Sequence, residues 1–144
     1  MKFGKILTKI INENDLTITK ISRSSGVDRT LIYRIITYET DLIFDTAMFI
    51  LGGAGYKLYL TTPDNETFNV LDFQHCMKIM LLETKLSIIE FAEHVGRSKG
   101  QVRKYVHGEI SPRFSTAIDI LEKAGYCLNA WDSAHANMIC LHQE

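Results

Sequence analysis

The stretch from Leu86 to Leu128 reads LSIIEFAEHVGRSKGQVRKYVHGEISPRFSTAIDILEKAGYCL, and the stretch from Leu16 to Leu58 reads LTITKISRSSGVDRTLIYRIITYETDLIFDTAMFILGGAGYKL. Aligned without a gap, they pair residues 70 positions apart and share an F-x-T-A…I-L…A-G-Y string. The register extends back to Phe3 over Phe73. A match of this length predicts that one unit is repeated. The boundary falls near residue 71, giving domains 1–71 and 72–144 with no flexible linker between them.

Composition places the 144-residue chain among globular proteins, with 46% hydrophobic and 23% charged residues. A net charge of −1 disfavours a sequence-independent nucleic-acid coat, which would be strongly basic, but allows a specific DNA binder with one basic face. The three cysteines are odd in number and widely spaced, so they form no disulfide framework. Neither a secretory signal nor a bilayer-spanning apolar stretch is evident, and we therefore expect a cytoplasmic protein without membrane association.

Apolar periodicity predicts four helices followed by a short β-hairpin in each unit, hence a mainly α fold with short hairpins. Thr17 and Asp28 are suitable N-caps for the second and third helices, and the Gly52-Gly53 pair ends the fourth. The expected helices cover about residues 3–11, 17–25, 28–37 and 41–52 in the first unit and about 73–84, 87–94, 98–107 and 113–124 in the second. The expected strands cover about residues 56–60, 68–70, 126–131 and 137–142.

In each unit, two of these helices flank a glycine, which is the helix-turn-helix arrangement. The turn requires a positive φ, and glycine adopts it without steric cost. The arrangement also needs a small residue before the turn glycine and two inward apolar residues after it. In the second unit these four residues are Ala92, Gly96, Val102 and Tyr105, and in the first they are Ser22, Gly26, Ile32 and Ile35.

With these residues the chain resembles the phage repressor and Cro type of helix-turn-helix protein, also called the xenobiotic-response-element (XRE) type. The second unit matches the signature of that family from Gly96 to Val102 and again at Gly108 and Pro112, although Arg97 occupies a usually apolar position. The first unit departs, with Tyr38 and Leu42 in place of Gly108 and Pro112. The strands AGYKLYL and AGYCLNAW are similar to those of antitoxin-type regulators, in which a terminal strand commonly contributes to a dimer sheet. The resemblance implies sequence-specific binding of double-stranded DNA.

The segment 97–104 of the second unit, RSKGQVRK, carries four cations and no acid. On a helix begun at Ser98, its polar side chains point outward around Val102 and Tyr105. Arginine and lysine bond phosphates or guanine edges, and glutamine bonds adenine. The candidate DNA-binding residues are Arg97, Ser98, Lys99, Gly100, Gln101, Arg103, Lys104 and His107. The alternative is a solvated cationic face on a structural repeat.

The corresponding helix of the first unit, DRTLIYRIITYE, carries more apolar surface than one inward stripe accommodates. The residues that exceed the stripe, and that form a candidate protein interface, are Leu31, Tyr33, Ile36 and Tyr38. Arg29, Thr30 and Arg34 hold the positions of Lys99, Gly100 and Lys104, and are candidate DNA contacts. This helix therefore either binds DNA weakly or has become an interface, and its spare apolar surface favours the interface.

The sequence offers no persuasive catalytic, metal or cofactor site. Its cysteines and histidines, among them His75, Cys76, Cys127, His135, Cys140 and His142, fit no zinc template. No phosphate-binding glycine loop follows an expected strand, and no catalytic grouping is present. We therefore expect neither an enzyme nor a cofactor or metal protein.

These features predict a DNA-binding transcriptional regulator that represses its own operon by covering a promoter. Two arrangements stay open. The chain is a covalent pseudo-dimer reading two half-sites, or one unit reads DNA while the other forms a homodimer. A function of another class is a protein-binding helix-turn-helix module, such as an antitoxin that binds a toxin or a phage-encoded inhibitor of a host protein.

Overall fold

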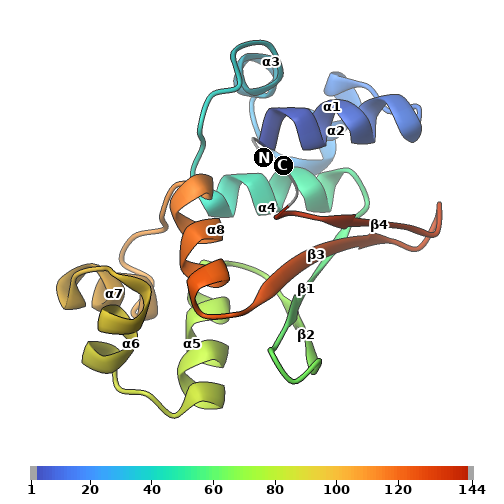
Figure 1. Cartoon of the computed structure of the whole chain (residues 1–144). Helices are drawn as coiled ribbons and strands as arrows, with labels where there is room; N and C mark the ends of the chain where they lie inside the picture. Colours follow the sequence, from blue (N-terminus) through green and yellow to red (C-terminus); the bar gives the residue numbers. More distant parts are fainter. Residues whose placement is uncertain (1–2, 143–144) are drawn as a thin grey trace.

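The computed structural model describes residues 3–142, which form eight helices and one four-stranded antiparallel sheet (Figure 1). The first half contains α1 (Phe3–Glu13), α2 (Ile18–Ser25), α3 (Arg29–Tyr38), α4 (Phe44–Gly53), β1 (Lys57–Thr61) and β2 (Thr67–Val70). The second half contains α5 (Phe73–Thr84), α6 (Ile88–Val95), α7 (Lys99–Val106), α8 (Phe114–Lys123), β3 (Cys127–Asp132) and β4 (Asn137–Cys140). Within residues 3–142, no helix is both long and apolar enough to cross a bilayer.

Helix starts follow local capping chemistry. The side chains of Thr17 and Asp28 accept hydrogen bonds from the first turns of α2 and α3, as the sequence predicts. Ser87 and Glu90 form a capping box at the start of α6. Each cap satisfies backbone N–H groups that have no partner inside the helix. The element order expected from periodicity is therefore present in the structure.

The fourth helix was expected from Asp41, and this start is wrong, because α4 begins at Phe44. Ile43, directly before α4, is extended and bridges to Arg113 in the segment before α8. The carboxylate of Asp41 accepts hydrogen bonds from the backbone N–H and the hydroxyl of Ser115. These partners lie 70 or more residues away, so helix propensity around Asp41 does not decide its conformation.

Both hairpins belong to one sheet, with strand order β2-β1-β3-β4. Its central pair is antiparallel, and Tyr59 lies opposite Asn129, the residue 70 positions later. The buried face of this pair brings Leu60 against Leu128. The sheet thus joins the two halves of the chain through backbone hydrogen bonds.

A second junction lies where α4 and α8 begin, at the centre of the molecule (Figure 1). The backbone N–H of Phe44 donates to Pro112 over 2.8 Å, and that of Phe114 donates to Leu42 over 2.7 Å. The rings of Phe44 and Phe114 stack with centroids 6.2 Å apart. Phe3 lies 5.2 Å from Phe114, and Phe73 lies 5.4 Å from Phe44. The core therefore runs through both halves.

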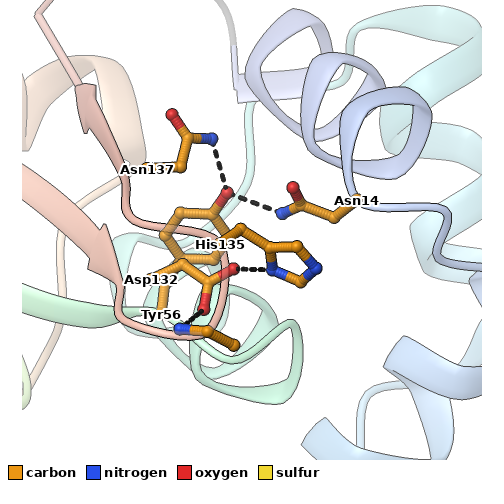
Figure 2. Close-up of polar contacts among 6 residues, drawn as sticks. Asn14, Tyr56, Asp132, His135 and Asn137 are labelled. Carbon is orange, nitrogen blue, oxygen red and sulfur yellow. Dashed lines mark hydrogen bonds and ion pairs between the residues drawn. The ribbon is translucent and has the colours of Figure 1, made fainter.

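A polar cluster fixes the β3–β4 turn against the end of α1 (Figure 2). The hydroxyl of Tyr56 accepts hydrogen bonds from the side-chain amides of Asn14, over 2.8 Å, and Asn137, over 3.1 Å. Asp132 is 2% exposed, and its carboxylate contacts the imidazole of His135 and accepts from the backbone N–H of Ala134. A buried carboxylate is tolerated only with such partners. The cluster therefore connects the two halves of the chain through hydrogen bonds.

The imidazole of His142 gives the fold a pH dependence. Its Nε2 accepts the backbone N–H of Leu128 over 2.8 Å, and burial lowers its pKa although Glu122 lies 3.4 Å from Nδ1. Because the folded pKa lies below the unfolded value of about 6.5, the neutral imidazole stabilises the fold above that pH, and this contribution is lost as pH falls through the folded pKa.

We expect the midpoint of urea unfolding to fall less between pH 7.5 and pH 5.5 in His142→Gln than in the unmodified protein. His94→Gln, which changes an exposed histidine, is the control and should leave the pH profile unchanged. Parallel profiles for His142→Gln and the unmodified chain would contradict this assignment.

Candidate nucleic-acid interface

Helices α6 and α7, with the turn between them, cover the residues that the sequence predicts as the second helix-turn-helix. Gly96 ends α6 at a φ of 71°, in the left-handed region, as the sequence predicts. The Ser98 hydroxyl then accepts the backbone N–H of Gln101 over 3.2 Å and caps α7. Val102 and Tyr105 are buried, and the Tyr105 ring meets Phe73 edge-on with centroids 5.4 Å apart. One face of α7 is thereby fixed to the core, and the opposite face is left to solvent.

The solvent face of α7 is cationic. Its exposed residues are Lys99, Gly100, Arg103, Lys104 and the following His107, at i, i+4 and i+8 spacing. Gln101 lies half-buried at the edge of this face. Apart from neighbouring residues and the helix's own backbone, no atom lies within 4 Å of where a Cβ on Gly100 would be, so the first turn of α7 is open at this position. A major groove admits such a helix, with arginine and lysine reaching phosphates and base edges.

Two of the predicted DNA contacts are engaged elsewhere. The Nη2 atom of Arg97 lies 2.9 Å from the carboxylate of Asp119, which also lies 3.1 Å from Nζ of Lys123. Hydrogen bonds from Lys123 and Arg97 hold the pKa of Asp119 below its usual value. Arg97 thus connects the turn after α6 to α8. The hydroxyl of Ser98 serves as the helix cap.

Helices α2 and α3, predicted from the sequence as the first helix-turn-helix, are joined by a similar turn, with Gly26 at a φ of 77°. Arg29, Thr30 and Arg34 are exposed on α3, and Arg29 donates a 3.4 Å hydrogen bond to Thr19. Their side chains therefore lie on the solvent face of α3, as those of Lys99 and Lys104 do on α7.

The apolar surface of α3 is smaller than the sequence indicates. Leu31 and Ile36 are half-buried and pack against the core, whereas Tyr33 and Tyr38 are 56% and 72% exposed. Helix α1 packs closely on α3, which reduces the exposed apolar surface of α3. A Cβ on Gly4 would lie only 2.4 Å from the carbonyl oxygen of Ile35. The candidate interface thus consists mainly of two tyrosines.

Both turn glycines give a stability prediction. A Cβ on Gly26 would have no neighbour within 4 Å, and one on Gly96 would meet only Nζ of Lys123 at 4.0 Å, so substitution costs backbone strain rather than a clash. We expect Gly96→Val and Gly26→Val each to lower the free energy of unfolding by about 1 kcal/mol or more, measured in urea. Gly100→Ala, inside α7, should be neutral or stabilising. Turn variants as stable as the unmodified chain would show that these turns tolerate L-residues.

Helices α3 and α7 are each the third helix of their half of the chain. In Figure 1, α3 and α7 lie on opposite sides of the adjacent α4 and α8. Their first residues, Arg29 and Lys99, are 70 positions apart, the same separation as Tyr59 and Asn129 in the sheet. Comparisons with known protein families, curated proteins and solved structures find no match to this chain.

Proposed function

We propose that the protein is a sequence-specific double-stranded DNA-binding transcriptional regulator, with α7 as its principal reading helix. The observation that carries this proposal is the exposed cationic face of Lys99, Arg103 and Lys104 on a capped helix whose other face is buried. In this proposal Gly100 allows close approach to base edges, and His107, at the C-terminal end of α7, contacts the phosphate backbone. By covering a promoter, such a protein represses transcription, including that of its own operon. It acts in the cytoplasm.

The pairing of residues 70 positions apart supports a second part of the proposal, that two fused four-helix units act as a covalent pseudo-dimer. Tyr59 pairs with Asn129 and Ile43 with Arg113, and the hydrogen bonds of Phe44 are reciprocated by Phe114. A two-fold relation of this kind places two reading helices for two half-sites. The strand contact that forms dimers in the regulators this chain resembles is already made within one chain, which favours the pseudo-dimer over a homodimer.

The test begins with selection of duplexes from a random pool, followed by affinity measurement at 150 mM salt on the selected duplex and a scrambled one. We expect the selected duplex to bind at least roughly 1000-fold more tightly. Sedimentation of the complex should give one chain per duplex. Equal affinity for the two duplexes would reject the proposal, and two chains per duplex would reject the pseudo-dimer.

A second candidate function, a protein-binding module, is favoured by the exposed Tyr33 and Tyr38. Tyr33→Ser with Tyr38→Ser tests whether α3 is an association surface, because substitution of the half-buried Leu31 or Ile36 would also disturb the core. If α3 is a homodimer interface, the unmodified chain sediments as a dimer and the double variant as a monomer, which retains the DNA contacts of α7. If α3 reads a second half-site, the unmodified chain is already monomeric and the double variant binds the selected duplex less tightly.

A further inference from the structure

A cleft of about 750 Å³ opens between α4, the last turn of α2 and the β1–β2 hairpin. Its volume lies within the range of small-molecule sites, roughly 300–1000 Å³. Buried Met48 and Leu58 line it, together with Phe49 and Leu71, which are 61% and 72% exposed, and half-buried Tyr59. The cleft is therefore largely apolar, with an aromatic residue from α4 and another from β1.

The residues 70 positions later differ in character. Phe49, Gly52 and Gly53 correspond to Asp119, Glu122 and Lys123. Asp119 pairs with Lys123, and Glu122 lies 3.4 Å from His142. Charged side chains with partners in the second half are thus replaced in the first by two glycines and an exposed phenylalanine.

The two glycines of α4 differ in what they permit. A Cβ on Gly53 would lie 2.7 Å from Cβ of Ser25, so Gly53 allows α2 to pack on α4. A Cβ on Gly52 would have no neighbour within 4 Å, so packing does not require glycine there. Glycine in a helix is unfavourable relative to alanine. Gly52 therefore weakens α4 without a packing reason, and it keeps the cleft open.

Charge indicates which ligand the cleft suits. Asp45 and Asp72 are half-buried in its lining, where α5 begins. One oxygen of Asp45 accepts the backbone N–H of Phe73 over 3.0 Å, and one oxygen of Asp72 accepts that of His75 over 2.8 Å. Among residues 3–142 the second oxygen of each carboxylate has no hydrogen-bond partner. The cationic lining residue, Lys57, is exposed and free to turn into solvent.

We propose that this cleft binds a small molecule that combines an apolar ring with a protonated amine. The ring contacts Phe49 and Tyr59, and the ammonium group bonds the unengaged oxygens of Asp45 and Asp72. Aromatic contact and charge-assisted hydrogen bonds together provide orientation as well as affinity. This inference is independent of DNA binding.

Three probes with one ring system test the proposal: tryptamine, 3-methylindole and indole-3-acetate, which carry a cationic, a neutral and an anionic group. Binding to the full chain without DNA is followed by amide chemical shifts in ¹⁵N-labelled protein. We expect tryptamine to shift the amides of Gly52 and Tyr59 and to bind at least tenfold more tightly than indole-3-acetate. Equal affinity of the cation and the anion, or no shift with any probe, would overturn the proposal.

Two variants locate the site. Gly52→Leu fills the cleft and should weaken tryptamine binding at least tenfold. Asp45→Asn with Asp72→Asn keeps both hydrogen-bond acceptors and the N-cap of α5, and should reduce tryptamine affinity to that of 3-methylindole. Asp64→Asn, which removes a charge from the exposed β1–β2 turn, is the matched control and should bind tryptamine normally. Unchanged tryptamine binding by either the filled or the double asparagine variant would also overturn the proposal.

Discussion

Replacing Lys99, Arg103 and Lys104 by alanine is expected to weaken binding to the selected duplex by at least about 100-fold, since three contacts at roughly 1 kcal/mol each are lost. The three side chains are exposed on one face of α7, so their removal leaves the buried contacts of Val102 and Tyr105 intact. Alanine also has a high helix propensity. The loss should therefore reflect DNA contacts rather than unfolding.

Salt dependence separates this effect from a general change of charge. Each phosphate contact contributes about 0.9 to the slope of log affinity against log salt, so the triple variant should lose up to about 3 from it. A control variant replaces Lys5, Lys9 and Lys78, which are exposed on α1 and α5, and has the same net charge. Equal losses in both variants, or full affinity in the α7 variant, would show that α7 is not the reader.

Phe114→Ala is expected to produce the largest loss of stability, about 3–5 kcal/mol, because it empties a site at the centre of the core. Phe114 is 2% exposed and its ring contacts Phe3 and Phe44 from the other half of the chain. Its backbone N–H also bonds Leu42 across the junction. Phe114→Leu retains part of the volume and should lose less.

Both halves should unfold in a single transition, since the core and the sheet are shared. Helical circular dichroism and the fluorescence of Trp131 in β3 should therefore give coincident urea midpoints within each protein, although the shared midpoint of Phe114→Ala is lower than that of the unmodified chain. Phe49→Ala, at a 61% exposed position, is the control and should cost less than about 1 kcal/mol. Two separate midpoints, or equal losses at Phe114 and Phe49, would contradict a shared core.

Some side chains singled out from the sequence have partners that only the fold reveals. Arg97 carries a charge suited to DNA and also pairs with Asp119 on α8, 22 positions later. Leu31 and Ile36 gave the apolar excess of α3, yet both pack against the core. The cleft had no clear sequence signal, because Gly52-Gly53 is equally well explained as the end of a helix.

By itself the sequence determined the order of helices and strands, the caps at Asp28 and Ser98, and the turns at Gly26 and Gly96. Those features depend on side-chain and backbone groups within about four residues, so local chemistry suffices to specify them. Only the tertiary structure decided that β1 pairs with β3 and that Ile43 is extended and bridges to Arg113 before α8. Backbone N–H and C=O groups are the same in every residue except proline, so the backbone of a strand does not specify which strand pairs with it. The partner is selected by burial of side chains such as Leu60 and Leu128, which come together only when both halves fold.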